Sequence, residues 1–160
     1  MHKAVFFDRD GVLNKERKDY VKTVKELEIF ENIGEIIKKL KDKDFKIIVI
    51  TNQSAINRNL TDKKNILEIH DSIQKFLEKS KTSIDAFYFC PHTPNENCVC
   101  RKPKSGLLIK AASDMNVDLK SSWMIGDNDS DIIAGENVGC KSLKIKNNQE
   151  LENIINVILN

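Results

Sequence analysis

The sequence predicts a single α/β domain in which helices cover both faces of a parallel sheet. Short apolar runs of strand length alternate along the chain with segments in which apolar residues recur at helical spacing. No repeat, low-complexity tract or linker rich in proline, glycine or serine divides the 160 residues. We therefore expect residues 1–160 to form one domain around one core.

The first half of the chain contains two predicted strands and two predicted helices. Residues 3–7 and 45–50 are mostly apolar segments of strand length, and each is followed by a helical pattern. In the first helix, apolar residues recur at helical spacing over residues 33–40. In the second, they recur over residues 66–77, and Thr61–Asp62 can cap its amino terminus.

The alternation continues through the second half of the chain. Asn116 and Gly139 are suitable residues for ending two of the helices. The predicted strands are Ile84–Phe89, Ser122–Ile125 and Leu143–Ile145, and the predicted helices lie at Leu107–Met115, Ile132–Asn137 and Leu151–Leu159.

Charge and hydropathy exclude several classes of protein. The 26 basic and 24 acidic side chains leave a formal net charge of +2, which argues against a nucleic-acid partner. The longest apolar runs have four or five residues, too few to cross a membrane. The first of them is interrupted at once by Asp8-Arg9-Asp10, unlike a secretory signal. We therefore expect a cytoplasmic protein with no membrane partner.

Acidic residues follow two of the predicted strands. Asp8 and Asp10 come directly after the first strand, and Gly11 permits a sharp turn there. Asp127 follows the fourth strand, and Asp131 comes one helical turn later. Ligands bind beyond the carboxyl ends of the strands in such sheets. Carboxylates that share a site repel one another unless a cation lies between them, and oxygen ligands of this kind suit Mg²⁺.

Thr51 and Lys102 also fall at predicted strand ends or in the loops beyond them. A hydroxyl and an ammonium group can hold the oxygens of a phosphoryl group while its charge shifts in the transition state. Either residue alone is more often a capping or solvent-exposed residue. Together with the aspartates they predict a site for phosphoryl chemistry at one edge of the sheet.

A second metal site is predicted from Cys90, His92, Cys98 and Cys100, which fall within eleven residues. This spacing is typical of a metal site rather than of a disulfide framework. Three thiolates and one imidazole form the ligand set of a closed tetrahedral zinc site. Four protein ligands leave no position for a catalytic water, so we expect a structural Zn²⁺ that holds a loop.

The order of these motifs resembles that of the haloacid dehalogenase-like phosphatases. Phe7–Asn14 is similar to the first motif of the family, and Thr51–Ser54 is similar to the second. Lys102 matches the third motif, and Gly126–Asp127 with Asp131 matches the fourth.

The cysteine-rich loop resembles that of two branches of this family. Cys90–His92 and Cys98–Pro103 are similar to the zinc loop of the heptose bisphosphate phosphatases and of the histidinol-phosphate phosphatases. The resemblance extends from Val5 to about Gly139, and it implies a Rossmann-like sheet.

The resemblance implies a two-step transfer of the phosphoryl group. Asp8 would attack phosphorus and form an aspartyl phosphate. Asp10 would protonate the leaving oxygen and then take a proton from the hydrolytic water. Asp8, the backbone carbonyl of Asp10 and Asp127 would bind Mg²⁺. Thr51 and Lys102 would stabilise the transferring group, and the remaining acid of the fourth motif, Asp131, would orient the lysine.

The intervals between the motifs leave no room for a separate cap domain. They span 41 residues from Asp10 to Thr51 and 51 residues from Thr51 to Lys102, and predicted helices, strands and the zinc loop fill them. We therefore expect an open site whose loops contact the substrate. The candidate substrate contacts are Glu16, Arg17, Lys18, Asp19, Tyr20, Thr51, Asn52, Gln53, Ser54, Arg58, Arg101, Lys102 and Asn128.

Thr51–Arg58 and Lys102–Gly106 resemble the heptose branch more closely than the histidinol branch, although Ala55 and Asn128 depart from the usual pattern. We expect a monomeric enzyme that removes the 7-phosphate of the sugar phosphate D-glycero-D-manno-heptose 1,7-bisphosphate. Three alternatives stay open: a histidinol-phosphate phosphatase, a non-enzymatic phospho-receiver and a nucleic-acid-end phosphatase. A receiver would carry its aspartate after a middle strand, and the last alternative would need a basic groove with stacking aromatics.

Overall fold

The computed structural model describes residues 1–160 and contains one five-stranded sheet. All neighbouring strands are parallel, which confirms the predicted sheet. The strands are β1 (Ala4–Phe7), β2 (Lys46–Asn52), β3 (Ala86–Cys90), β4 (Trp123–Gly126) and β5 (Lys141–Lys144). Their order across the sheet is β3-β2-β1-β4-β5.

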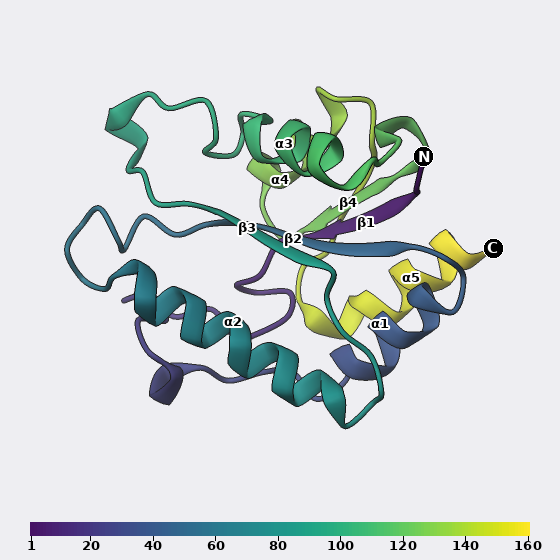
Figure 1. The fold of residues 1–160 in the computed structure, drawn as a ribbon, viewed down its shortest axis with the longest axis horizontal. Coiled ribbons are helices and arrows are strands. Elements are labelled where there is room, and N and C mark those ends of the chain that lie inside the picture. Colours follow the sequence, from purple (N-terminus) through teal and green to yellow (C-terminus); the bar gives the residue numbers. More distant parts are fainter.

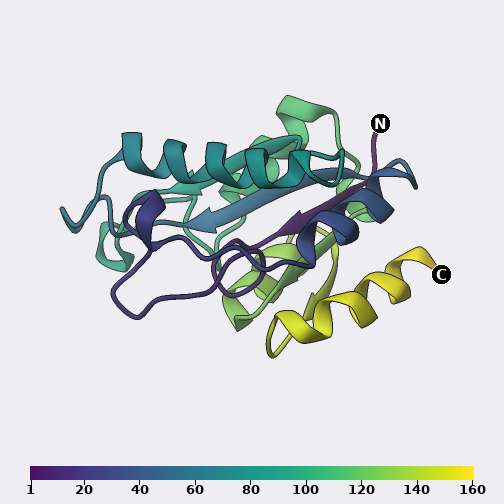
Figure 2. The same cartoon turned by 90° about the horizontal axis from the view of Figure 1, so that it is seen from below.

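Helices cover both faces of this sheet. The α-helices are α1 (Ile33–Lys41), α2 (Lys63–Glu78), α3 (Gly106–Met115), α4 (Asp129–Glu136) and α5 (Leu151–Leu159). Helices α3 and α4 lie on one face, and α1, α2 and α5 lie on the other (Figure 1). Figure 2 shows the second group from below, with its helices running roughly along the direction of the strands.

Each central strand is buried on both faces, which explains why it reads as an unbroken apolar run. In β1, Val5 and Phe7 belong to the larger core cluster, which α1, α2 and α5 cover. Ala4 and Phe6 belong to the smaller cluster under α3 and α4. This alternation follows from the two-residue period of a strand, and all four side chains are fully buried.

The predicted elements are confirmed, with shifts of two or three residues at an end of β2, β3, α4 and β5. Helix α4 begins at Asp129 rather than Ile132, because Asn128 caps it and exchanges hydrogen bonds with Asp131 in a capping box. This polar first turn carries no apolar periodicity. Strand β5 begins at Lys141 rather than Leu143. It is an edge strand with lysines at both of its ends, so an apolar run in the sequence does not mark its first residue.

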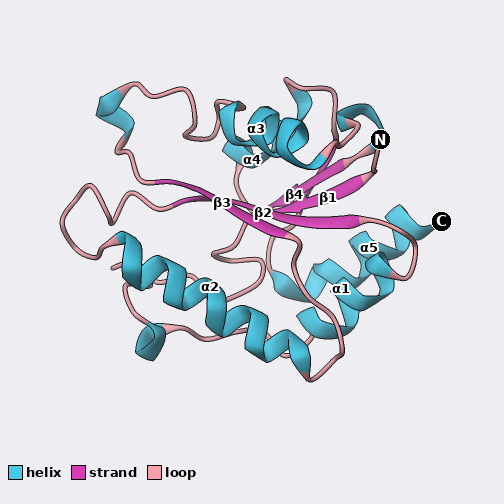
Figure 3. Cartoon of the chain, in the orientation of Figure 1, coloured by secondary structure: helices cyan, strands magenta, loops and turns pink.

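The loops that follow β1, β2 and β3 all extend from the same edge of the sheet, on the left in Figure 1. Figure 3 shows that these connections are mostly irregular, and the one after β1 contains only the short 3₁₀ helix η1 (Val24–Glu26). No separate cap domain is inserted between the strands. None of the helices is both long enough and apolar enough to span a membrane.

Candidate active site

The ammonium group of Lys102 lies between two buried carboxylates at the carboxyl ends of the central strands. Its Nζ is 2.9 Å from Oδ1 of Asp8 and 2.6 Å from Oδ1 of Asp131. It also donates to the backbone carbonyl of Ile50 at 2.8 Å. The side chains of all three charged residues are at most 10% exposed. Because an ammonium group has three protons, these contacts hold Lys102 in one orientation.

The backbone of Lys102 is fixed as firmly as its side chain. Asn52, the last residue of β2, accepts a hydrogen bond from the Lys102 N–H at 3.0 Å. Its side-chain amide also donates to the Lys102 carbonyl at 3.2 Å. This pair of hydrogen bonds ties the loop that contains Lys102 to the end of the sheet.

The carboxylate oxygens of Asp8, Asp127 and Asp131 lie within 4.8 Å of one another. Burial raises the pKa of Asp8 well above its ordinary value, Lys102 opposes this, and Asp131 adds to it. Burial also raises the pKa of Asp127. Gly11 has a φ of +86°, and a Cβ atom there would collide with the Asp127 carboxylate. The ammonium group of Lys102 contacts only two of these crowded acids, Asp8 and Asp131. The carboxylates of Asp8 and Asp127 are oxygen donors of the kind that fits Mg²⁺.

The carboxylate of Asp10 is held by three side chains. Nη2 of Arg9 donates to both of its oxygens, at 3.0 and 3.2 Å. Asn14 donates to Oδ1 at 3.0 Å, and Gln53 donates to Oδ2 at 2.9 Å. Burial raises the pKa of Asp10, but the Arg9 charge and these hydrogen bonds outweigh burial and lower it overall. The roles of Arg9 and Asn14 here were not predicted from the sequence.

A cavity of about 360 Å³ opens over this cluster. Asp8, Asp10 and Asp131 line it, and so do most of the predicted substrate contacts. Val21 and Ser130 also line it and were missed, although Ser130 adjoins the fourth motif. The predicted contacts that line the cavity are Glu16, Arg17, Lys18, Tyr20, Asn52, Gln53, Ser54, Arg58, Arg101, Lys102 and Asn128.

Two predicted contacts lie outside the cavity lining. Thr51 is fully buried, and its hydroxyl accepts a hydrogen bond from Gln53 at 2.8 Å. Asp19 is exposed and pairs with Arg17 at 3.0 Å and with Lys22 at 3.1 Å. The structure therefore places these side chains behind and beside the cavity rather than on its surface.

The arginines that line the cavity differ in the number of ion pairs and hydrogen bonds that their guanidinium groups form. Arg17 is committed to two carboxylates, because it also pairs with Glu26 at 2.9 Å. Arg58 bonds only to the Ser54 hydroxyl, at 3.2 Å. Arg101 donates to the backbone carbonyl of His92 at 3.3 Å. Since neither Arg58 nor Arg101 forms an ion pair, both can bind an anionic ligand.

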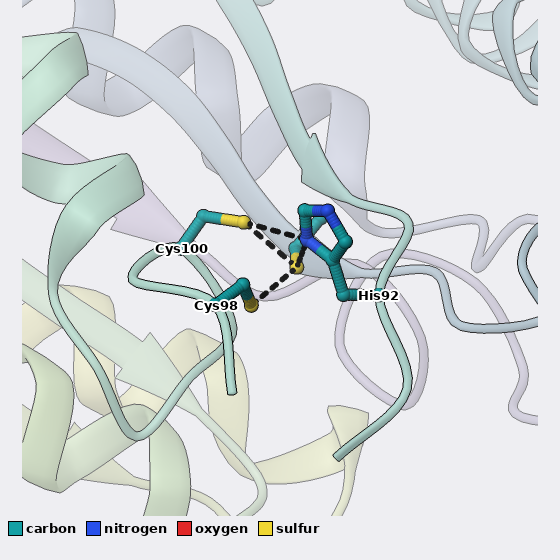
Figure 4. Close-up of side chains that lie close together, drawn as sticks. His92, Cys98 and Cys100 are labelled. Carbon is teal, nitrogen blue, oxygen red and sulfur yellow. Dashed lines mark hydrogen bonds between the residues drawn. The ribbon is translucent and has the colours of Figure 1, made fainter. Parts of the chain in front are cut away.

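The four predicted zinc ligands are brought together at the end of β3 and in the loop that follows it. Figure 4 shows His92, Cys98 and Cys100 turned toward one another. Nδ1 of His92 is 3.2 Å from Sγ of both Cys90 and Cys100, and the Cys90 and Cys98 sulfurs are 3.6 Å apart. All four cysteines of the chain are free. Three thiols and an imidazole that converge in this way fit Zn²⁺.

Hydrogen bonds from backbone N–H groups favour the thiolate form of Cys98. Burial raises the pKa of Cys98, but hydrogen bonds from the backbone N–H groups of Arg101 and Cys100 lower it overall to about 6. The sulfur is therefore available as a thiolate, the form that binds zinc. Because Arg101 and Lys102 directly follow Cys100, the cysteine-rich loop also positions two residues of the cavity.

Replacing Cys98 by serine should remove most of the bound zinc and lower the melting temperature. Metal binding to a loop of this kind is part of its folding free energy. Metal analysis and a thermal melt of the purified protein measure both effects. Cys140→Ser is the matched control, since Cys140 is buried away from the cluster, and it should retain the metal. Protein purified without chelators that contains no zinc would contradict the assignment of the site.

The chain is similar to known phosphatases in sequence and in structure. A family model described as HAD-hydrolase-like matches residues 99–153. The D-glycero-beta-D-manno-heptose-1,7-bisphosphate 7-phosphatase of Helicobacter pylori is 41% identical over 148 residues, which cover 92% of this chain and 82% of that protein. The D-glycero-alpha-D-manno-heptose-1,7-bisphosphate 7-phosphatase of Campylobacter jejuni is 37% identical over 150 residues, with coverages of 94% and 86%.

One solved structure is similar over almost the whole chain. It is the D,D-heptose 1,7-bisphosphate phosphatase of B. bronchiseptica, complexed with magnesium and phosphate. The TM-score is 0.86 and the sequence identity is 30%, over 95% of this chain and 86% of that one.

Proposed function

This chain belongs to the haloacid dehalogenase-like phosphatases, and from that membership we propose that it removes the 7-phosphate of D-glycero-D-manno-heptose 1,7-bisphosphate. One observation carries the proposal. The cavity combines Asp8 and Lys102 at its base with two arginines, Arg58 and Arg101, that form no ion pair. A bisphosphate can place one phosphate at the base and the other against the arginines.

In the first step, a carboxylate oxygen of Asp8 attacks phosphorus, and the bond from phosphorus to the sugar oxygen breaks. Because the pKa of Asp10 is lowered in the free site, its carboxyl group must take up a proton as the phosphate ester binds, and it then gives this proton to the departing sugar oxygen. Lys102, held against Asp8 at 2.9 Å, stabilises negative charge on the transferring group. The product of this step is an aspartyl phosphate and the free sugar hydroxyl.

In the second step, Asp10 takes a proton from a water molecule as the water attacks the aspartyl phosphate. The bond between phosphorus and the Asp8 oxygen breaks, which releases inorganic phosphate and restores both aspartates. Asp8, Asp127 and the backbone carbonyl of Asp10 would hold Mg²⁺. A bound Mg²⁺ supplies positive charge that offsets repulsion between an anionic nucleophile and the phosphate.

The substrate assignment is tested by phosphate release from both anomers of the heptose bisphosphate and from histidinol phosphate. Both anomers are included because relatives named for each are similar to this chain. We expect one heptose anomer to have the highest kcat/KM, with the 1-phosphate retained in the product. A higher kcat/KM for histidinol phosphate would overturn the proposed substrate. Absence of steady turnover on any phosphate ester would favour a phospho-receiver instead.

Replacing Arg101 by alanine should lower kcat/KM more for the bisphosphate than for a heptose monophosphate. The lost contact is to the distal phosphate, and a hydrogen bond to a charged group contributes about 1.5–3 kcal/mol, or roughly tenfold or more in kcat/KM. Lys104→Ala is the matched control, since Lys104 is exposed and lies outside the cavity. Equal losses on both substrates would indicate that Arg101 only supports the adjacent Lys102.

A further inference from the structure

Arg9 is fully buried, although it lies between the two aspartates of the first motif. A buried charge is costly unless it is paired and hydrogen-bonded. One end of its guanidinium group, Nη2, donates to Asp10, and the other end, Nη1, lies 3.2 Å from Nε2 of His70. A chain of three side chains therefore connects helix α2 to Asp10.

His70 must be the acceptor in this contact. A guanidinium group has only donors, so Nε2 of His70 is unprotonated and the ring proton is on Nδ1. Burial and the neighbouring charge of Arg9 lower the pKa of His70 to about 3. The imidazole is thus neutral, and its acceptor is present, throughout the neutral pH range.

The imidazole is also held in place by the sheet. His70 is only 4% exposed, and its ring stacks on Phe87 of β3 with centroids 4.3 Å apart and planes at 12°. Phe89 contacts the ring edge at a centroid distance of 6.2 Å. Packing on two sides prevents the ring from turning, so Nε2 offers a fixed acceptor to Arg9.

We propose that His70 is a positioning residue that fixes Arg9 and, through it, the carboxylate of Asp10. The proposal rests on the acid–base role given to Asp10 above. His70 does not line the cavity, so it acts through Arg9 rather than on the substrate. Of the three side chains that donate hydrogen bonds to Asp10, only Arg9 is charged. Apart from Asp10, the guanidinium group of Arg9 has one hydrogen-bond partner, which is His70.

Loss of this acceptor should displace Asp10. Nε of Arg9 already lacks a partner, so without His70 a second buried nitrogen would be unpaired. The guanidinium group would then move toward any available acceptor and draw the Asp10 carboxylate with it. A displacement of about 1 Å in a reacting group can lower the rate by ~10²-fold.

Two substitutions at His70 distinguish the effect of losing the hydrogen-bond acceptor from the effect of losing the packed ring. His70→Phe keeps an aromatic ring against Phe87 and removes the acceptor. His70→Gln loses the ring but can place an amide oxygen near the position of Nε2. Ile73→Ala, at a buried position of α2 one turn further on, is the control for lost stability. The readouts are kcat and KM for the heptose bisphosphate, or for whichever ester is turned over best, together with the melting temperature.

We expect His70→Phe to lower kcat about 10- to 100-fold with KM within about twofold, because Asp10 acts in the chemical steps rather than in binding. His70→Gln should recover most of kcat, and Ile73→Ala should lower the melting temperature without lowering kcat. Equal kcat values for His70→Phe and His70→Gln, or an equal loss in Ile73→Ala, would overturn the proposal.

A double substitution gives an independent test. In an Asp10→Asn background, His70→Phe should lower kcat by less than about twofold further, since the residue that it positions is already inactive. A full additional loss would show that His70 acts elsewhere. If Asp10→Asn alone had wild-type kcat, the proposed role of Asp10 would fail whatever the His70 variants do, so the two failures are distinguishable.

Discussion

Asp8→Asn is expected to abolish phosphate release, with a loss on the order of a millionfold in kcat, as is typical when a nucleophile is removed. The amide has nearly the same shape as the carboxylate, but it cannot attack phosphorus at a useful rate. Asp71→Asn, on the exposed face of α2, is the matched control and should keep full activity. Release of phosphate by Asp8→Asn at the wild-type rate would exclude the aspartyl-phosphate mechanism.

The same substitution should not lower the stability of the protein in magnesium-free buffer. Burial raises the pKa of Asp8 in the folded state, so at neutral pH its ionised form is less favourable in the folded chain than in the unfolded chain. A neutral amide avoids that cost, and Lys102 retains its contacts with Asp131 and the Ile50 carbonyl. A thermal melt should therefore give a melting temperature equal to or above that of the wild type.

The parts of the site that could be predicted lie at the ends of apolar strands. Asp8 and Asp127 follow β1 and β4 directly, so their meeting at one edge follows from a parallel sheet. The cysteine cluster was predictable for a different reason, because its ligands are close together in the sequence. In both cases a local pattern was enough to define the position of the side chains.

Contacts that depend on how a helix or loop packs could not be predicted. The approach of His70 to Arg9 spans 61 residues and depends on which face α2 presents to the sheet. The residues next to His70 in the sequence therefore do not indicate this contact. Likewise, Arg17 lines the cavity, but the sequence does not indicate that Asp19 and Glu26 pair with it. The sequence identifies charges in such a loop without identifying their partners.

The position of Lys102 depends both on a local sequence motif and on contacts with elements that are distant in the sequence. It follows Cys100 by two residues, and Asn52 of β2 binds its backbone. Its ammonium group then meets acids from the ends of β1 and the first turn of α4. The cysteine-rich loop, the sheet and the acidic cluster therefore meet at one side chain.

Lys102→Met should cost about 3–5 kcal/mol of stability at neutral pH, since it leaves buried charges without their partner. Asp8, Asp131 and the Ile50 carbonyl would all lose the same donor. Turnover should fall by several orders of magnitude, as expected when a preorganised charge at the transferring group is removed. Lys102→Arg is a second variant to measure, because it keeps the charge but replaces a compact ammonium group by a planar guanidinium group.

The stability of Lys102→Met in magnesium-free buffer should depend on pH in a defined direction. The pKa of Asp8 is already raised in the folded wild type, and removing the attraction of Lys102 raises it further. A carboxyl whose pKa is higher in the folded than in the unfolded state binds more protons when folded, so stability falls as pH rises through the folded pKa. Melting temperatures measured from about pH 5 to about pH 8 should therefore fall more steeply in Lys102→Met than in the wild type. Parallel curves would show that the lysine does not hold the Asp8 carboxylate in its charged form, and its role would then be confined to the bound phosphate.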